Sequence, residues 1–133
     1  MDVYCTLSSK VNHSPELMPA IQRYNSELVK RIYEKSKAHN TEFRVLSEKY
    51  GLLKAYDKVP GVYKISYDKI EYKTKNMEKL KKLIKKQSLE QKISRILFFS
   101  KQSSQSEPYI KALKDGCKEA GIEFILLILP STL

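Results

Sequence analysis

One strongly apolar stretch of the chain reads Arg95-Ile96-Leu97-Phe98-Phe99-Ser100. Four consecutive apolar residues without polar alternation are typical of a β-strand that is covered on both faces. A second run of this kind, Glu123 to Leu129, follows after a helix pattern. Strands that alternate with helices are typical of a parallel sheet, so this region predicts an α/β fold.

The helix between these two strands has clear start and stop signals. Ser106 and Pro108 are typical of a first turn, and Gly121 is typical of a C-cap. Between these signals, apolar residues recur at the three- and four-residue spacing of one buried helix face. The residues of this face are Ile110, Leu113, Cys117 and Ala120.

The earlier part of the chain shows the same alternation. Residues 2–7 and 42–47 are expected to form strands, and one helix is expected to run from 14 to 39 between them. Gly51 indicates a turn soon after the second strand. Residues 63–67 alternate between apolar or aromatic and polar side chains, as in a short edge strand.

From Asn76 onward, apolar and lysine side chains separate to opposite sides of a predicted helix. The segment from Lys69 to Arg95 carries ten positive and three negative side chains, which is +7 of the net charge of +10. Such a local positive field suits a phosphate-rich partner. The alternative interpretation is a lysine-rich helix face that is simply solvated. Its apolar side holds Met77, Leu80, Leu83 and Ile84, and its basic side holds Lys79, Lys81, Lys82, Lys85 and Lys86.

These elements predict a small three-layer α/β domain, with a mostly parallel four-stranded sheet and helices on both faces. A length of 133 residues suits one domain, 1–133. The longest apolar run is too short for a membrane helix, and no basic-then-apolar leader precedes the first strand. We therefore expect no membrane partner and a cytoplasmic location, and the oligomeric state stays open.

Serine and lysine residues follow three of the predicted strands. Because the carboxyl ends of parallel strands meet at one edge of a sheet, we expect these residues to share an anion-binding cleft. Serine-rich loops are also ordinary turns and caps, so both interpretations stay open for each serine. The candidate phosphate- or nucleic-acid-binding residues are Ser8, Ser9, Lys10, Ser47, Lys49, Tyr50, Ser100, Lys101, Lys82 and Lys86.

Motifs of the common cofactor sites are absent from the sequence. The four glycines do not form a dinucleotide-binding or P-loop pattern. Neither Cys5 and Cys117 nor His13 and His39 show the spacing of metal ligands. We therefore expect no cofactor and no metal, and two cysteines are too few for a disulfide framework.

The most specific string is Val45-Leu46-Ser47-Glu48-Lys49-Tyr50-Gly51-Leu52-Leu53, followed by Asp57, Pro60 and Tyr63. It resembles a segment of the YaaA-type peroxide-stress proteins, and more closely a family of small proteins that share a Leu-Ser-x-Lys-Tyr-Gly-Leu-Leu signature. It is more distantly similar to the uracil-DNA-glycosylase-like module of archaeosine-forming tRNA enzymes. Residues 5–10 and 24–28 carry two weaker matches to the same group.

The resemblance implies a Rossmann-like or glycosylase-like α/β domain with a positively charged cleft that is used on nucleic acid. Within the matched string, the Tyr50 ring could stack on a base, and it could equally pack beneath its own loop. The Asp57 carboxylate could act as a general base or contact a base edge, and it could equally stabilise a turn.

Three functional hypotheses follow, in this order. The first is a nucleic-acid- or nucleotide-binding domain that uses a basic cleft at the carboxyl ends of the strands. The second is an enzyme acting on a nucleotide or modified base, at a glycosidic bond or by related chemistry, with Asp57 as the catalytic residue and with Lys10 and Ser47 holding the substrate. The third is an accessory domain whose basic helix docks an acidic protein. A fold does not fix a function, so the residues leave open whether the protein is an enzyme and whether it binds DNA, RNA or a free nucleotide.

Overall fold

The computed structural model describes residues 1–9, 11–61, 70–101 and 103–130, and side chains in the third range from residue 76. Its central feature is a five-stranded sheet in the order β4-β3-β1-β6-β7. Every neighbouring pair of strands is parallel except β3 and β4, which are antiparallel. The strands are β1 (Asp2–Leu7), β3 (Glu42–Ser47), β4 (Gly51–Leu53), β6 (Arg95–Lys101) and β7 (Glu123–Leu129).

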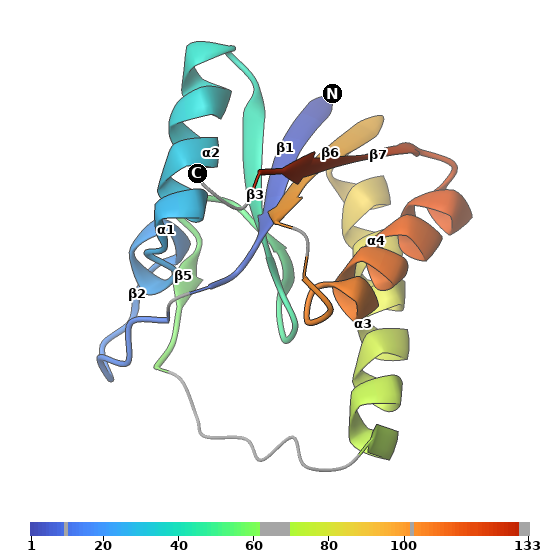
Figure 1. The fold of residues 1–133 in the computed structure, drawn as a ribbon, viewed down its shortest axis with the longest axis horizontal. Helices are drawn as coiled ribbons and strands as arrows, with labels where there is room; N and C mark the ends of the chain where they lie inside the picture. Colours follow the sequence, from blue (N-terminus) through green and yellow to red (C-terminus); the bar gives the residue numbers. More distant parts are fainter. Residues whose placement is uncertain (10, 62–69, 102, 131–133) are drawn as a thin grey trace.

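Helices cover both faces of this sheet (Figure 1). α2 (Glu27–Ala38) lies on one face near the short α1 (Ala20–Arg23), and α3 (Ile70–Glu90) packs beside α4 (Glu107–Ala120) on the other. The predicted α/β architecture with a mostly parallel sheet is confirmed. All four predicted strands are present, and β4 is a fifth strand that the prediction missed. α3 begins before the predicted Asn76, and the possible strand at 63–67 lies outside the described residues.

Two apolar clusters fill the spaces between the sheet and its helices. On one side, α3 and α4 bury Leu80, Ile84 and Leu113 against side chains of β1 and β6. On the other side, α2 buries Val29 and Ile32 against side chains of β3 and β6. Alternate residues of a strand point to opposite faces, so β1, β3 and β6 supply both clusters. The near-continuous apolar sequence of β6 follows from this two-sided burial.

The helix predicted over 14–39 is in fact two helices preceded by a short strand. β2 (Met18–Pro19) comes first and pairs with β5 (Lys58–Val59), and α1 then ends before Ser26. The Oγ atom of Ser26 accepts a hydrogen bond from the N–H of Val29 at 3.1 Å, so Ser26 is the N-cap of α2. The prediction of a helix start at Ser14 is therefore wrong. The Ser14 hydroxyl instead accepts a weak bond from the Glu16 N–H, at 3.3 Å.

Arg23 holds the segment that precedes α1. Its side chain is fully buried, and its guanidinium donates hydrogen bonds to the carbonyls of Asn12, Ser14, Glu16 and Val59. A planar guanidinium presents five donors in a fixed geometry, which allows one side chain to bind several carbonyls at once. Arg23 thereby fastens the 12–16 loop to β5.

The predicted boundaries of the last helix are confirmed, but the environment of the last strand is not. α4 follows Ser106, has Pro108 in its first turn and ends at Gly121, whose φ of 73° is left-handed.

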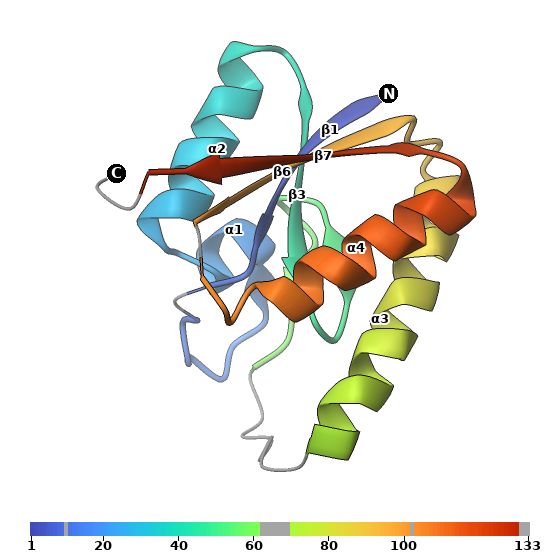
Figure 2. The ribbon, with the colours of Figure 1, turned by 45° about the vertical axis from the view of Figure 1, so that its right-hand side comes forward.

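β7 was expected to be covered on both faces, and it is instead an edge strand. Its side chains Leu126 and Ile128 are 38% and 49% exposed. Figure 2 shows β7 crossing the front of the sheet.

Candidate functional site

The three serine-bearing strand ends do meet at one edge of the sheet. β1, β3 and β6 are parallel, and the register places Leu7 beside Leu46 and Thr6 beside Phe99. Continuing this register by one or two residues places Ser8 level with Ser47 on one side and with Lys101 on the other. The N–H of Ser8 donates to the carbonyl of Leu46 at 2.9 Å, which keeps the β1 end against β3. We call this end of the sheet the carboxyl edge.

The connections that leave β1 and β6 go to opposite faces of the sheet. The chain after β1 leads to α2 on one face, and the chain after β6 leads to α4 on the other face (Figure 1). In open parallel sheets, ligands bind where two adjacent strands send their connections apart in this way. The Thr6 hydroxyl donates to the Phe99 carbonyl at 3.0 Å and ties the two strands together just below this point.

The hydroxyl of Ser9 reaches the N-terminus of α2. It donates to the Oγ of Ser26 at 2.7 Å, and Ser26 in turn caps the helix. Ser9 itself is half-buried. The first N–H groups of a helix have no partners within the helix and attract anions.

Ser47 and Ser100 are buried and already hydrogen-bonded. The Ser47 hydroxyl accepts bonds from the Tyr50 N–H at 3.3 Å and from the Tyr24 hydroxyl at 3.5 Å. The Ser100 hydroxyl donates to the Lys101 carbonyl at 2.9 Å and lies 3.4 Å from the Ser106 hydroxyl. Their exposed fractions are 3% and 4%. Both serines therefore shape the carboxyl edge, and Ser8, Ser9 and Lys101 form its accessible part.

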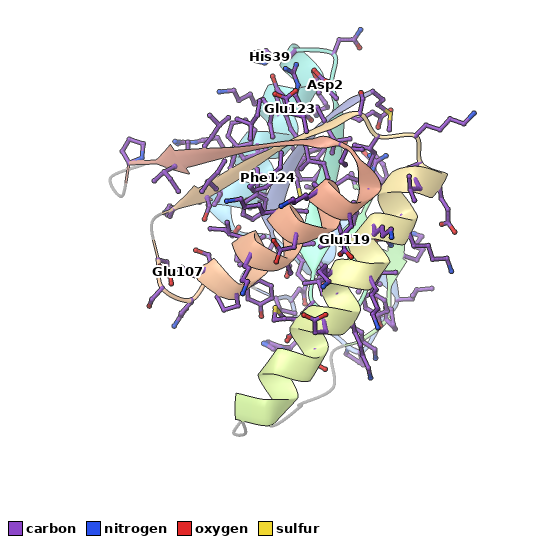
Figure 3. The ribbon with its side chains drawn as sticks, turned by 90° about the vertical axis from the view of Figure 1, so that its right-hand side faces the viewer. Asp2, His39, Glu107, Glu119, Glu123 and Phe124 are labelled. Atoms are coloured by element: carbon purple, nitrogen blue, oxygen red, sulfur yellow. The ribbon has the colours of Figure 1, made fainter. Side chains whose placement is uncertain are left out.

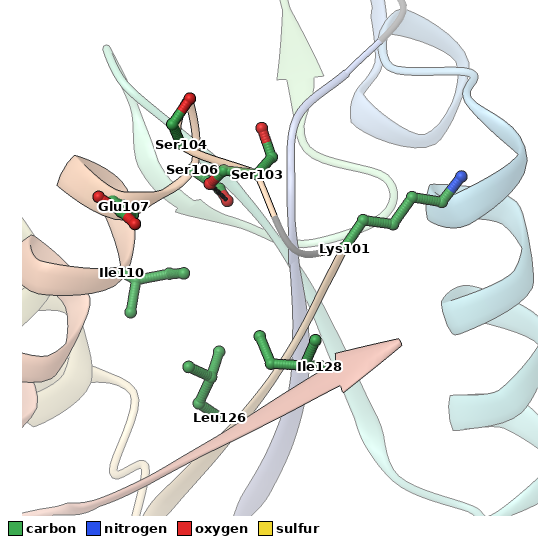
Figure 4. Close-up of a pocket in the computed structure, with 8 residues that line it drawn as sticks. All are labelled: Lys101, Ser103, Ser104, Ser106, Glu107, Ile110, Leu126 and Ile128. Atoms are coloured by element: carbon green, nitrogen blue, oxygen red, sulfur yellow. Dashed lines mark hydrogen bonds between the residues drawn. The ribbon is translucent and has the colours of Figure 1, made fainter. Parts of the chain in front are cut away.

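Lys101 is an exposed cation at this edge. It follows Phe99 by two residues, so its side chain leaves the sheet on the face that α2 covers. Figure 4 shows the side chain extending toward α2 and away from Ser103, Ser104 and Ser106. Among the described residues no ion pair engages its ammonium group.

Two further lysines of the predicted binding set, Lys10 and Lys49, follow β1 and β3 in the sequence. Lys10 lies outside the described residues. Lys49 is exposed, and its ammonium group lies 5.5 Å from the centre of the Tyr50 ring. The half-buried Tyr50 ring packs against the cluster on the α2 side of the sheet, as the packing interpretation predicts.

Lys82 and Lys86 project from the outer face of α3. A helix turns by about 100° per residue, so these side chains lie opposite the buried Leu80 and Ile84. The amphipathic helix is therefore confirmed, but its basic face is a different surface from the carboxyl edge. Acidic residues also offset part of its charge: Lys81 pairs with Glu78 at 3.0 Å and Glu119 at 3.7 Å, and Lys86 with Glu90 at 4.0 Å.

Lys81 has a structural role within this basic face. Figure 3 shows Glu119 on α4 where that helix runs beside α3, and the ion pair with Lys81 links the two helices there. The hydrogen bond with Glu78 raises the pKa of the Lys81 ammonium group. The exposed lysines Lys79, Lys82 and Lys85 have no ion pair within the described part of the chain.

Asp57 closes a turn beside α1. β4 is antiparallel to β3, and the residues after it contact α1: the Ala20 N–H donates to the Asp57 carbonyl and the Ile21 N–H to the Ala55 carbonyl. The Oδ2 atom of Asp57 accepts a hydrogen bond from the Lys54 N–H at 2.8 Å. This geometry supports the turn interpretation and gives no support to a general base.

The string from Leu46 to Leu53 forms a hairpin that α3 holds in place. Ser47 pairs with Gly51 at its tip, and Gly51 has a left-handed φ of 71°. The side-chain amide of Gln87 donates to the Tyr50 carbonyl at 2.9 Å and accepts from the Leu52 N–H at 2.7 Å. The Tyr-Gly-Leu part of the string therefore has a structural role. Gly51 lies between the Tyr50 carbonyl and the Leu52 N–H, and the Gln87 side chain binds both of these groups.

A cavity of about 420 Å³ lies beside the carboxyl edge, between the start of α4 and β7 (Figure 4). Ile110, Leu126 and Ile128 form its apolar side, and three serines and Glu107 form most of its polar rim. The sequence does not predict this cavity, because the apolar run that contains Leu126 and Ile128 is typical of a strand covered on both faces. The signal that was present is the serine cluster before α4. The lining residues are Lys101, Ser103, Ser104, Ser106, Glu107, Ile110, Leu126 and Ile128.

The two cysteine thiols are buried. Burial raises the pKa of the Cys5 thiol and that of Cys117, the latter to about 12, so both thiols are protonated at neutral pH. Within ranges 1–9, 11–61, 70–101 and 103–130, no three His, Cys, Asp or Glu side chains gather as metal ligands would. Across the same residues, no helix has the length and apolar content to span a bilayer.

Comparisons of the chain with protein-family models, with curated proteins and with solved structures find no match. The resemblance of residues 45–53 to the YaaA-type proteins therefore stays a prediction. What the site can do has to follow from its own geometry.

Proposed function

We propose that this protein binds the phosphate groups of a nucleic acid or nucleotide at the carboxyl edge of its sheet. One observation carries the proposal: Ser8 directly follows β1 and Lys101 ends β6, two adjacent parallel strands whose connections leave to opposite faces. An ammonium group and a hydroxyl at such a point are suited to an anion. The division of the connections about β1 also supports a Rossmann-like arrangement.

The surroundings of this edge support an anionic ligand further. Ser9 and the N-cap Ser26 lie on the α2 side, which is also the side toward which Lys101 extends. The positive end of the α2 dipole adds to the charge of Lys101 there. The net charge of +10 gives the whole molecule a long-range attraction for polyanions.

The lysines of α3 favour a polymer over a free nucleotide. Lys79, Lys82 and Lys85 are exposed on a surface separate from the carboxyl edge. A free nucleotide at the edge would leave that surface unused, whereas a nucleic-acid strand spans more than one phosphate-binding surface. Nucleic acid is therefore the ligand class that accounts for both surfaces.

The proposal is tested by fluorescence anisotropy with labelled single-stranded DNA and RNA oligonucleotides. Binding should weaken roughly tenfold or more between about 50 and 200 mM salt, because each neutralised phosphate releases counterions. Lys101→Gln should weaken binding, whereas Lys30→Gln, at an exposed position on α2, should not. Binding that is insensitive to salt, or that responds equally to both variants, would contradict the proposal.

Adenosine monophosphate as a competitor distinguishes the two ligand forms. The variant Lys79→Gln/Lys82→Gln/Lys85→Gln lacks the α3 lysines and should hold an oligonucleotide by the carboxyl edge alone. A large excess of the mononucleotide should therefore displace the oligonucleotide from this variant more readily than from the unaltered protein. Equal displacement from both proteins would show that the α3 lysines do not contribute to binding and that only the carboxyl edge binds the ligand.

A further inference from the structure

β7 is an edge strand with an uninterrupted apolar run, which lies between Glu123 and Pro130. Residues 124–129 contain neither a charged residue nor a proline. In the described part of the chain β6 is its only sheet neighbour. Natural edge strands are usually protected by lysines, prolines, bulges or a covering helix, and a long apolar edge is a template for another strand.

The backbone of β7 presents unpaired hydrogen-bonding groups along this edge. The N–H of Glu123 donates to the Ser94 carbonyl at 3.1 Å, so it points toward β6. Successive residues of a strand direct their N–H and C=O groups to opposite sides. The groups of Phe124, Leu126 and Ile128 therefore point outward, where a further strand would bind them.

Side chains on the same strand provide a place for an apolar residue of that further strand. Leu126 and Ile128 are the exposed apolar side chains of β7, and both face the cavity that Ile110 also lines (Figure 4). A strand added at the outer edge would point alternate side chains to this face and cover the opening. Main-chain bonds and side-chain pockets are the two components of strand addition.

Charge on the adjacent helix indicates what kind of strand would bind. Lys111, Lys114 and Lys118 are exposed on α4, at a spacing that aligns them along one side of the helix. Among the described residues no ion pair engages them. An acidic segment is therefore complementary to this surface. A second copy of the chain is a poor occupant, because two molecules of net charge +10 repel one another.

We propose that β7 is a docking strand for an extended segment of another protein, with alternating apolar side chains and acidic residues beside them. The segment adds to β7 as a sixth strand of the sheet. One of its apolar side chains covers Leu126 and Ile128 at the cavity, and its acidic residues face the α4 lysines. This surface does not depend on nucleic-acid binding at Ser8 and Lys101.

A synthetic peptide tests this proposal: Asp-Glu-Val-Thr-Val-Thr-Val-Asp-Glu, fluorescently labelled and capped at both ends. Anisotropy should show saturable binding that weakens roughly tenfold in the Leu126→Thr/Ile128→Thr protein. Leu89→Thr is the matched control, since Leu89 is 55% exposed on α3. Lys111→Gln/Lys114→Gln should also weaken binding. A peptide with lysines in place of the acidic residues should bind more weakly still.

Hydrogen exchange identifies the bound edge. The amides of Phe124, Leu126 and Ile128 should exchange rapidly in the free protein and slowly with the peptide, whereas those of Ile125 and Leu127 should be protected in both. The proposal is overturned if the peptide does not bind, if the lysine peptide binds equally well, or if these outward amides stay unprotected. A dimer by light scattering with the outward amides protected would also overturn it, because a second copy would then cover β7.

Discussion

The side-chain Oε1 atom of Gln87 lies 2.3 Å from the position that a Cβ atom on Gly51 would occupy. The same oxygen accepts the Leu52 N–H, so it cannot move away without losing a hydrogen bond. Leu83 of α3 approaches the same position to 2.9 Å. The close approach of α3 to the β3–β4 hairpin therefore requires a residue without a side chain at position 51.

Gly51→Ala should lower the free energy of unfolding by about 3 kcal/mol, because it adds both a clash and left-handed strain. Gly121→Ala is a matched control, since Gly121 has a nearly equal φ of 73° and no atom near its Cβ position. This control should lose only about 1 kcal/mol. Urea unfolding of both variants measures the difference, and equal losses would mean that the contact with Gln87 costs nothing.

Gln87→Ala should destabilise the protein by about 2 kcal/mol, since it leaves the Tyr50 carbonyl and the Leu52 N–H without their partner. It should also lessen the cost of Gly51→Ala by removing the nearest obstructing atom. A double-mutant cycle in urea tests this coupling. Strictly additive losses would show that residues 51 and 87 act independently.

Arg23→Met should lower the free energy of unfolding by about 3 kcal/mol, because four backbone carbonyls lose the donor that the buried Arg23 guanidinium supplies. Limited proteolysis should show faster cleavage within residues 12–16. Arg31→Met, at an exposed position on α2, is the control. Unchanged cleavage in the Arg23 variant would mean that the loop is held by other contacts.

Ser8→Ala and Ser47→Ala should have different effects, although both residues belong to the predicted binding set. Ser47 is buried and hydrogen-bonded, so its loss should cost about 1 kcal/mol of stability. Ser8 is half-buried at the accessible edge, so its loss should weaken nucleic-acid binding with little change in stability. Oligonucleotide anisotropy and urea unfolding of both variants check this, and the reverse pattern would move the ligand to Ser47.

The two buried thiols should make stability fall at alkaline pH. In the folded protein burial raises the pKa of Cys117 from 9.0 to about 12 and also raises that of Cys5. An unfolded chain loses these protons above pH 9 while the folded chain retains them, so unfolding becomes more favourable between pH 9 and about 12. Below pH 9 this contribution to stability is fully present.

Urea midpoints at several pH values above neutrality measure this dependence. Replacing both cysteines, as Cys5→Val/Cys117→Ala, should flatten it, and the lysines and tyrosines that titrate in the same range are unchanged in that variant. An identical slope in both proteins would show that the thiols do not contribute.

The sequence predicted the elements whose signals are local. The continuous apolar run of β6 identified a strand buried on both faces, and Ser106 with Gly121 identified the ends of α4. The break before α2 was missed because Leu17, Ile21, Tyr24, Leu28 and Ile32 continue a helical spacing through it. The spacing of apolar residues does not show that a new helix begins at Ser26, which acts as its N-cap. β4 was missed because a three-residue antiparallel strand after a turn carries almost no pattern of its own.

The sequence predicted which segments form the candidate site, namely those that follow the strands, but it did not predict which of their residues are accessible. Parallel topology brings the segments after β1, β3 and β6 to one edge, as expected from their order. Side-chain burial decides which of them are accessible, and nothing local distinguishes the buried Ser47 and Ser100 from Ser8. The cavity was not predictable, since an apolar run such as β7 is the same sequence whether a helix covers it or solvent does.

The central place of β1 affects how the chain reaches its native state during synthesis. β1 ends at Leu7, yet one of its two neighbours, β6, begins only at Arg95. A nascent chain therefore exposes one side of its middle strand until β6 has been synthesised. Contacts of such long sequence separation form slowly, so translation speed and early chaperone engagement should influence the yield of this protein more than that of a locally connected helical bundle.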